Sequence, residues 1–348
     1  MMSNEIYPWQ ENAWQQLQQL RPRMPPAILF HGAAGIGKSD FIERFAQSLL
    51  CEDVRLDGHA CGHCASCGWF LQQNHPDYRR VRPEALEDEA PLDDEDGAAK
   101  KSAKSTKAPS KEIKIEQIRA LADFMNISTH RQGLRVVVLY PAEALNTPAS
   151  NALLKTLEEP PPGTVFLLAS HSLDRLLPTI LSRCRKFLLP MPSHEQALTW
   201  LVAQGVSGAD SWLREQGGAP LAALAQAQSD NGNRDDTEAL LLLLAHPTLE
   251  GALKTVEKLQ KAPLGALVSC LQRWLYDLFS YKLAGVIRYY PRYQTELAGL
   301  AGKVHISRLM GALKSANERR AIAEHPLSPK LFIEDMLLDY TACLKGIE

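Results

Sequence analysis

The chain has 348 residues, of which 45% are hydrophobic and 22% charged, a globular composition whose length predicts two or three domains. Lys and Arg number 38 against 40 Asp and Glu, and the resulting net charge of −2 argues against a protein held on DNA or on a membrane by bulk charge. The apolar run at 239–245 is too short to cross a bilayer, and the N-terminal residues lack a basic-then-apolar signal pattern, so we expect a cytoplasmic protein.

The first predicted elements are a strand, a loop and a helix. Residues 27–30 (AILF) form a short apolar strand, and a glycine-rich turn separates it from apolar residues at helical spacing between residues 41 and 50. Residues 84–111 then open with eight acidic side chains and continue as KKSAKSTKAPSK. Because this stretch has almost nothing to bury, we predict a disordered insert in a loop.

Strands and helices alternate after the insert. Residues 113–125 have helical spacing, residues 135–140 (RVVVLY) are typical of a buried β-branched strand, and residues 150–159 predict a helix that three prolines stop. A further strand is predicted at residues 165–169. This alternation predicts an α/β domain with a parallel sheet.

From about residue 190 onwards only helical patterns are found, among them residues 264–279 and 306–322. The polar cluster SDNGNRDD at residues 229–236 is predicted to be a turn that separates a small helical bundle from a larger one. We therefore predict three domains: an α/β nucleotide-binding domain over residues 1–189 with a cysteine module (51–67) and the insert (84–111), a small helical domain over 190–240, and an all-α domain over 241–348.

The glycine-rich turn fits the pattern G-x-x-x-x-G-K-[ST], in the strand-to-helix context which that pattern requires. Its residues are Gly32, Gly35, Gly37, Lys38 and Ser39. The glycines let backbone N–H groups converge on phosphate oxygens, Lys38 adds a point charge, and Ser39 can reach Mg²⁺. A glycine-rich turn that binds nothing is the alternative, but we favour a site for ATP or ADP with Mg²⁺.

A nucleotide-hydrolysing site also needs a neighbouring strand that ends in acidic residues, which hold Mg²⁺ and polarise the attacking water. The best candidate strand here ends in Tyr140 and Pro141, and neither residue can do this. Glu143 lies beyond the strand end, roughly 6 to 7 Å away if the chain is extended, and is a less favoured substitute. The pattern indicates a nucleotide pocket without its hydrolytic half.

Four cysteines lie within seventeen residues, in two C-x-x-C steps that share one cysteine: Cys51, Cys61, Cys64 and Cys67. Four converging thiolates favour a tetrahedral zinc ion and leave no open position for a substrate water, so we predict a structural Zn²⁺ site. An iron–sulfur centre or a redox pair is compatible with the same spacing. His59 and His63 are expected at the surface rather than as substitute ligands.

Three further motifs follow: NHPDY at 74–78, NALLKTLEEPP at 151–161 and LSRC at 181–184. Together, the motifs between about residue 8 and residue 184 resemble those of bacterial clamp-loader subunits of DNA polymerase III. Within this group, the resemblance is strongest to subunits of the delta-prime type. The resemblance implies an AAA+ module of two domains, the second a small lid, and a helical domain in a pentameric collar. It implies the delta and the gamma or tau motor subunits as partners and, through the complex, the sliding clamp and primed DNA at the replisome.

The resemblance also suggests a role for Arg183 in the LSRC motif. In this family the corresponding arginine is a finger inserted into the ATP site of the neighbouring subunit, where a guanidinium stabilises charge on the γ-phosphate. Without the resemblance, Arg183 would more simply be a surface charge beside Arg185 and Lys186. With it, a finger that acts in trans is the better interpretation.

Two departures from the family's motor subunits point to a delta-prime type that does not hydrolyse ATP itself. The motors carry an Asp–Glu pair where this chain has Tyr140-Pro141, and a nucleotide-sensing arginine near the position of Leu221. The intact phosphate loop points the other way, so a DNA-stimulated ATPase of the gamma or tau type is the second hypothesis. A zinc-supported nucleic-acid binder outside replication is the third. No clustered carboxylates suggest a polymerase or nuclease site, so a nucleotidyltransferase activity would belong to the holoenzyme.

Overall fold

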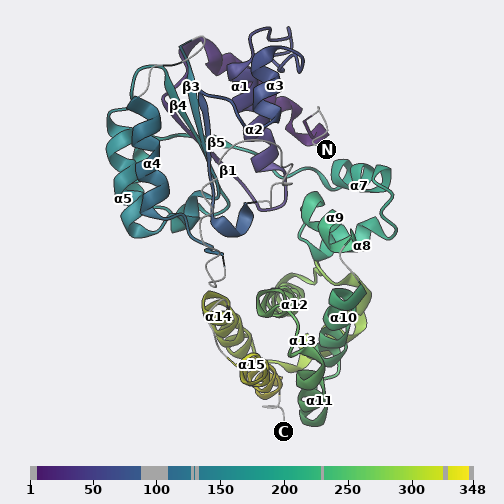
Figure 1. Ribbon diagram of the computed structural model, residues 1–348. Coiled ribbons are helices and arrows are strands. Elements are labelled where there is room, and N and C mark those ends of the chain that lie inside the picture. The colour runs from purple at the N-terminus through teal and green to yellow at the C-terminus, as the bar shows by residue number, and fades with distance from the viewer. Residues whose placement is uncertain are drawn as a thin grey trace, which may run out of the picture. The chain divides into compact units, whose positions relative to one another are not determined.

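The computed structural model describes residues 6–87, 109–126, 129, 133–228, 231–323 and 328–344. The chain divides into two compact units, Met1–Ser193 and His194–Glu348 (Figure 1). The central part of the predicted insert, residues 88–108, lies outside the described residues. None of the helices in the described ranges is long and apolar enough to cross a membrane.

The first unit is built on a five-stranded sheet in which all pairs are parallel, with the strand order β2-β3-β4-β1-β5. The strands are β1 (Ala27–His31), β2 (Tyr78–Val81), β3 (Arg135–Leu139), β4 (Thr164–Ser170) and β5 (Arg185–Leu188). The prediction of a parallel α/β sheet is confirmed. The edge strands β2 and β5 were not predicted, because each carries two charged residues in a row where a central strand would be apolar.

Helices cover both faces of this sheet, which explains why its central strands are apolar without interruption. One face packs against α1 (Glu11–Leu20), α2 (Lys38–Leu50) and α3 (Ala65–Leu71). The other face packs against α4 (Ile115–Asn126), α5 (Thr147–Glu158) and α6 (Pro178–Arg183), and Figure 1 shows α4 and α5 on the side of the sheet opposite to α2. On β1, Ile28 and Phe30 enter the first core while Ala27 and Leu29 enter the second.

The helix of the NALLKTLEEPP motif begins earlier than predicted. Asn146 caps α5, since its side chain accepts a hydrogen bond of 2.9 Å from the Ala149 N–H. Leu153 and Leu157 are buried in the core beneath it, as their helical spacing predicts. The exposed charges of the helix therefore gather at its C-terminal end, close to α6.

The insert prediction is wrong at both of its ends. Glu84–Leu86 is a turn of 3-10 helix, and the Ala85 N–H donates to the carbonyl of Ser110 at 3.0 Å. The Lys114 ammonium also lies 2.8 Å from the Glu84 carboxylate. These contacts join the two ends of the insert, so order extends further into the charged stretch than its composition indicates.

The described part of the second unit contains only helical elements. They are α7 (His194–Ala203), α8 (Ala209–Glu215), α9 (Pro220–Gln228), α10 (Asn231–Ala245), α11 (Leu249–Leu259), α12 (Leu264–Ala284), α13 (Gln294–Lys303), α14 (Ile306–Ile322) and α15 (Pro329–Leu344). The turn predicted at 229–236 is wrong from Asn231 onwards, where α10 already begins. Asn and Asp residues are common both in turns and in the first turns of helices, so their composition did not distinguish the two.

Two apolar cores hold the second unit. Helices α7, α8 and α9 pack around Leu201 and Leu213, whereas the remaining helices pack around Trp274 and Leu278. The Trp274 indole donates a hydrogen bond of 2.8 Å to the Tyr340 hydroxyl, which donates in turn to the Leu244 carbonyl at 2.7 Å. This buried chain of hydrogen bonds ties α12, α15 and α10 together.

Candidate functional site

The phosphate-loop motif joins the end of β1 to the start of α2, and its glycines are required by the backbone. Gly35 and Gly37 have φ angles of 73° and 82°, in the left-handed region that other residues rarely occupy. A Cβ atom at Gly37 would lie 2.4 Å from Cε2 of Tyr7, and one at Gly32 would lie 2.4 Å from the carbonyl oxygen of Leu189. The turn is therefore closely packed as well as sharply bent.

The segment before α1 holds the outer side of this loop. The Trp9 indole N–H and the Gln10 amide donate to the carbonyl of Ile36 at 3.0 and 2.9 Å, and the same amide donates to the carbonyl of Gly37 at 3.0 Å. In a trans peptide the N–H points opposite to the carbonyl, so the following N–H groups point away from Trp9 and Gln10. This is the orientation in which a phosphate loop presents its donors to an anion. The contacts of Trp9 and Gln10 with the loop could not be predicted from the spacing of the motif, because they join residues far apart in the sequence.

Lys38 closes the loop on itself. Its ammonium donates to the carbonyl of Gly32 at 2.9 Å and to that of Ala33, and the residue is 3% exposed. Burial lowers the pKa of Lys38 to about 8, against the opposing effect of the Glu143 carboxylate. Ser39, in the first turn of α2, is half-buried. A phosphate oxygen that replaced the two carbonyls would raise the pKa of Lys38 again, because a neighbouring anion favours the charged ammonium.

The end of β3 lies at the same edge of the sheet, because β1, β3 and β4 are parallel. Tyr140 packs towards the core beneath α2, where its hydroxyl shares a hydrogen bond with Arg82, and burial raises the pKa of Tyr140. Pro141 offers no side-chain ligand for a metal ion. The two positions at which a hydrolytic site needs acids therefore supply neither a metal ligand nor a base.

Glu143 lies in a turn just after β3 and contacts the chain just after β4. The turn Ala142–Ala144 folds it back, and its Oε1 accepts a hydrogen bond of 2.9 Å from the backbone N–H of His171, just after β4. Its Oε2 is buried, with no hydrogen-bond partner among the described residues. Burial, followed by the charge of Lys38, lowers the pKa of His171. Glu143, His171 and Lys38 thus form one group of titratable residues at this edge.

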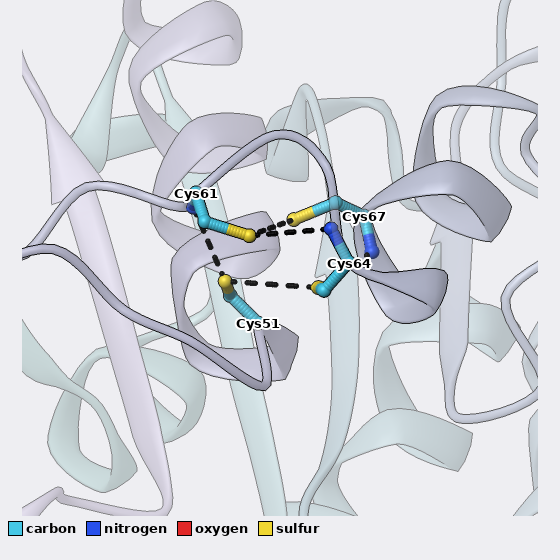
Figure 2. A group of neighbouring side chains, drawn as sticks. All are labelled: Cys51, Cys61, Cys64 and Cys67. Carbon is cyan, nitrogen blue, oxygen red and sulfur yellow. Dashed lines mark hydrogen bonds between the residues drawn. The ribbon is translucent and has the colours of Figure 1, made fainter.

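The four cysteines of the predicted metal site lie together (Figure 2). Their sulfur atoms all lie within 4.8 Å of one another, with 3.9 Å between the sulfurs of Cys51 and Cys64 and 4.0 Å between those of Cys61 and Cys67. Zn–S bonds of about 2.3 Å in a tetrahedron place the sulfurs about 3.8 Å apart. The donor set therefore fits one zinc ion, and its separations are far longer than a disulfide bond.

Backbone N–H groups point at these sulfurs, as thiolates require. Cys51 accepts from the N–H of Cys61 at 3.2 Å, Cys61 accepts from that of Cys64 at 3.3 Å, and Cys64, which caps α3, accepts from that of Cys67 at 3.4 Å. Burial raises the pKa of the Cys61 thiol, but the N–H donors more than offset burial and lower it to about 7. The donors thus favour negative sulfur, the form that binds metal, at Cys61, whereas burial raises the pKa of the Cys51 and Cys67 thiols.

The two histidines near the module lie outside this sulfur cluster. The His59 ring stacks on Trp14, with the ring centroids 4.3 Å apart. The His63 side chain is 75% exposed, with its Nε2 3.8 Å from the Asp53 carboxylate. Asp53, Cys61 and His63 can together form a second ligand group, but it shares Cys61 with the four-sulfur set and two of its members are exposed.

Arg183 lies at the last position of α6 and is partly exposed. Its Nη1 donates to the carbonyl of Thr179 at 3.0 Å, and its Nη2 donates to the carboxylate of Glu158 at the end of α5. The following residue, Cys184, is buried, and burial raises its pKa to about 11. A buried anchor next to a partly exposed guanidinium gives Arg183 a defined position at the surface.

A family model and two relatives indicate the family of this chain. The family model described as DNA polymerase III, delta subunit, matches residues 9–193. The DNA polymerase III subunit delta' of Pseudomonas aeruginosa (strain PAO1) is 34% identical over 313 residues, covering 88% of this chain and 85% of its own. The corresponding subunit of Escherichia coli (strain K12) is 32% identical over 248 residues, covering 70% of this chain and 67% of its own.

More distant similarities extend to a tau subunit and to a gamma subunit-related protein. The DNA polymerase III subunit tau of Salmonella typhimurium is 32% identical over 174 residues, covering 50% of this chain and 23% of its own. Among solved structures, a DNA polymerase III, gamma subunit-related protein of Thermotoga maritima aligns over 95% of this chain and 99% of its own, at 16% identity and a TM-score of 0.45. The family match over more than half of the chain, together with the two delta' relatives, shows that this chain belongs to the delta' (delta-prime) family of DNA polymerase III subunits.

Proposed function

We propose that this chain is a clamp-loader subunit that does not hydrolyse ATP itself but supplies Arg183 to the ATP site of a neighbouring motor subunit. In this role it assembles with gamma or tau and with delta in a pentamer, and helps to place the sliding clamp on primed DNA during replication in the cytoplasm. Polymerase activity belongs to the holoenzyme as a whole.

The observation that carries the proposal is the end of β3. Tyr140 is engaged with Arg82 and the core, and Pro141 has no ligand atom, so the site lacks the acid pair that nucleotide hydrolysis uses. Arg183, by contrast, is partly exposed at the end of a helix and anchored by buried Cys184. A guanidinium in that setting can stabilise the charge that develops on a transferring γ-phosphate of another subunit.

The remaining sites have supporting roles. The phosphate loop binds ATP or ADP with Mg²⁺ through Lys38 and Ser39 and keeps it as a structural element. The four cysteines hold a structural Zn²⁺ ion, which stabilises the crossover between α2 and β2. Residues 190–240 serve as a lid and residues 241–348 as the helical collar through which the subunit joins its partners.

The test is ATP hydrolysis in two settings. The purified chain, with and without primed DNA, should show no turnover that depends on Lys38, so Lys38→Ala should leave any background unchanged. In a complex reconstituted with gamma or tau and delta, Arg183→Ala should lower hydrolysis by about 10³-fold, the lower range for an arginine finger. Arg185→Ala, which removes an exposed arginine two residues away, is the matched control and should leave the rate unchanged. An unchanged rate with Arg183→Ala would refute the finger.

A DNA-stimulated ATPase of the gamma or tau type is the second candidate, and one observation favours it. The Glu143 Oε2 is buried without a hydrogen-bond partner in the described part of the chain and lies at the same edge as Lys38. An acid there can hold Mg²⁺ or polarise a water molecule. Turnover by the purified chain that is stimulated by primed DNA and lost with both Lys38→Ala and Glu143→Gln would establish this function in place of the first.

A further inference from the structure

A cavity of about 570 Å³ at the free edge of the sheet is lined by eight residues, of which three are arginines. Arg79 and Arg80 belong to the edge strand β2, and Arg82 follows it. Gln73 and Asn74 also line this cavity. Three strand spacings separate β2 from β1 in the sheet, about 14 Å, so this cavity is distinct from the phosphate loop.

The lining residues of this cavity carry a net positive charge, whereas the whole chain has a net charge of −2. Arg79, Arg80 and Arg82 are among its lining residues, and Glu87 is the single acid among them. Glu43 is not among the lining residues, but its carboxylate lies 3.8 Å from the Arg80 guanidinium. The cavity therefore presents a net positive surface, and its other lining atoms are mainly hydrogen-bond donors and acceptors.

Two of the guanidinium groups are held in place before any ligand arrives. Arg79 donates from Nη1 to the carbonyl of Tyr78 at 2.8 Å, and its guanidinium carbon lies 4.4 Å from the centre of the Phe124 ring. Arg80 donates from Nη2 to the side-chain oxygen of Gln73 at 2.7 Å. Each group keeps further N–H donors beyond these contacts, because a guanidinium has five. A ligand would meet ordered donors and lose little affinity in ordering them.

The residue that orients Arg80 has an unfavourable backbone conformation. Gln73 has a φ of 59° and is the one non-glycine residue with positive φ in the described ranges. It lies two residues after α3, where its N–H donates to the carbonyl of Phe70 at 3.0 Å and the next N–H donates to that of Trp69 at 2.9 Å. Glycine is the usual residue in this helix-ending turn and would avoid the strain. Strain of this kind occurs at binding sites, and here it places an amide against Arg80.

We propose that this cavity binds phosphate groups, such as those of a nucleic-acid backbone or of a free nucleotide. The guanidinium fork pairs with two phosphate oxygens at once, and arginine is for this reason favoured over lysine at phosphate sites. The side-chain amide donors of Gln73 and Asn74 can complete the contacts. The site is independent of the ATP-site roles proposed for Lys38 and Arg183, so either assignment can fail without the other.

The first test measures the binding of a fluorescein-labelled single-stranded oligonucleotide, 20 nucleotides long (the 20-mer), to the full chain. Binding is followed by fluorescence anisotropy between about 50 and 200 mM salt. Arg79→Gln and Arg80→Gln should each weaken binding severalfold at 50 mM salt. Each should also reduce the slope of log K against log salt by about 0.7, the value for one phosphate contact on a single strand. Arg23→Gln removes an exposed arginine of the same unit and should leave both quantities unchanged. Equal losses in all three variants would overturn the proposal.

A second arm distinguishes the source of the phosphate. Inorganic pyrophosphate is titrated calorimetrically into Lys38→Ala protein, in which the phosphate loop is disabled, with and without Arg79→Gln. Heat that depends on Arg79 identifies a site that also accepts free phosphates, whereas binding of the 20-mer alone identifies the nucleic-acid backbone. Absence of binding by both probes would overturn the proposal.

Gln73→Gly separates a binding role from a merely structural one. Glycine relieves the strained φ, so the melting temperature should rise or stay the same, while loss of the amide that holds Arg80 should weaken binding of the 20-mer. Opposite changes in stability and affinity are not expected if the cluster only supports the fold. Unchanged affinity in Gln73→Gly protein would overturn the assignment.

Discussion

Glu158→Gln should release Arg183 and raise ATP hydrolysis by the neighbouring motor subunit. In this chain the Arg183 guanidinium is bound to the Glu158 carboxylate, which competes with any phosphate for the same donors. A finger that acts in trans has to exchange one anionic partner for another. The glutamine variant keeps the shape of the side chain and removes its charge, so it weakens the Arg183–Glu158 ion pair and leaves the contacts of Arg183 with phosphate unchanged.

The exposure of the two side chains sets the size of this effect. Arg183 is 32% exposed and Glu158 is 49% exposed, so their ion pair is screened by water and contributes about 0.2 to 1 kcal/mol. If the whole contribution is lost from the resting state, the barrier falls by at most about 1 kcal/mol. This corresponds to an increase in rate of up to about fivefold.

The assay is steady-state hydrolysis by the reconstituted complex at low and at moderate salt, since screening should reduce the gain. Glu159→Gln is the matched control, because it removes an equal charge from the next residue, which is also exposed. In an Arg183→Ala background, Glu158→Gln should have no effect. The refuting result is a Glu158→Gln rate equal to the Glu159→Gln rate, in a complex in which Arg183→Ala still abolishes turnover. This result would refute the exchange of anionic partners at Arg183, but not the role of Arg183 as a finger.

Three further predictions concern metal, pH and stability. Cys67→Ser should remove the stoichiometric zinc of the purified chain and lower its melting temperature. Metal analysis and thermal melting measure the two effects. A native chain that contains no zinc would contradict the proposed zinc site. The pKa of Lys38 is lowered to about 8 by burial, below its value of about 10.4 in an unfolded chain. The unfolded state therefore binds more protons between these pH values, so the free energy of unfolding should rise as the pH rises from about 8 to about 10.4. Nucleotide affinity should fall above about pH 8, because Lys38 loses its charge. Lys38→Arg should abolish both pH dependences. Tyr340→Phe leaves the Trp274 N–H and the Leu244 carbonyl unpaired, so the free energy of unfolding should fall by about 2 kcal/mol in denaturant titrations. Tyr281→Phe, at a half-buried tyrosine, should change it little.

The sheet was predictable where burial on both faces demanded continuous apolar runs, as in β1, β3 and β4. It was not predictable at its edges. Arg79 and Arg80 on β2 and Arg185 and Lys186 on β5 satisfy strand geometry by pointing their charges to solvent or to polar partners, so no apolar pattern marks them. The edge that carries the proposed phosphate cavity was therefore not visible in the sequence.

The candidate site divides in the same way. The residues of the phosphate loop and the cysteine cluster form local motifs, because each needs neighbours at fixed spacing to converge on one ligand. Trp9 contacts Ile36 across 27 positions and Glu158 contacts Arg183 across 25, and no local pattern encodes such pairs. Glu143 was a less favoured substitute acid because it lies beyond the strand end, and the turn that joins it to the His171 N–H was not predicted.

The packing around Gly37 affects how well the glycines of the phosphate loop are conserved during evolution. The Tyr7 ring and the positive φ exclude any side chain there, whether or not a nucleotide is ever bound. Purifying selection for folding alone would therefore preserve much of the glycine pattern in a lineage that had given up ATP. Among homologues, the glycines would be uninformative about nucleotide use, and covariation between Lys38 and Glu143 would be the sequence record to consult.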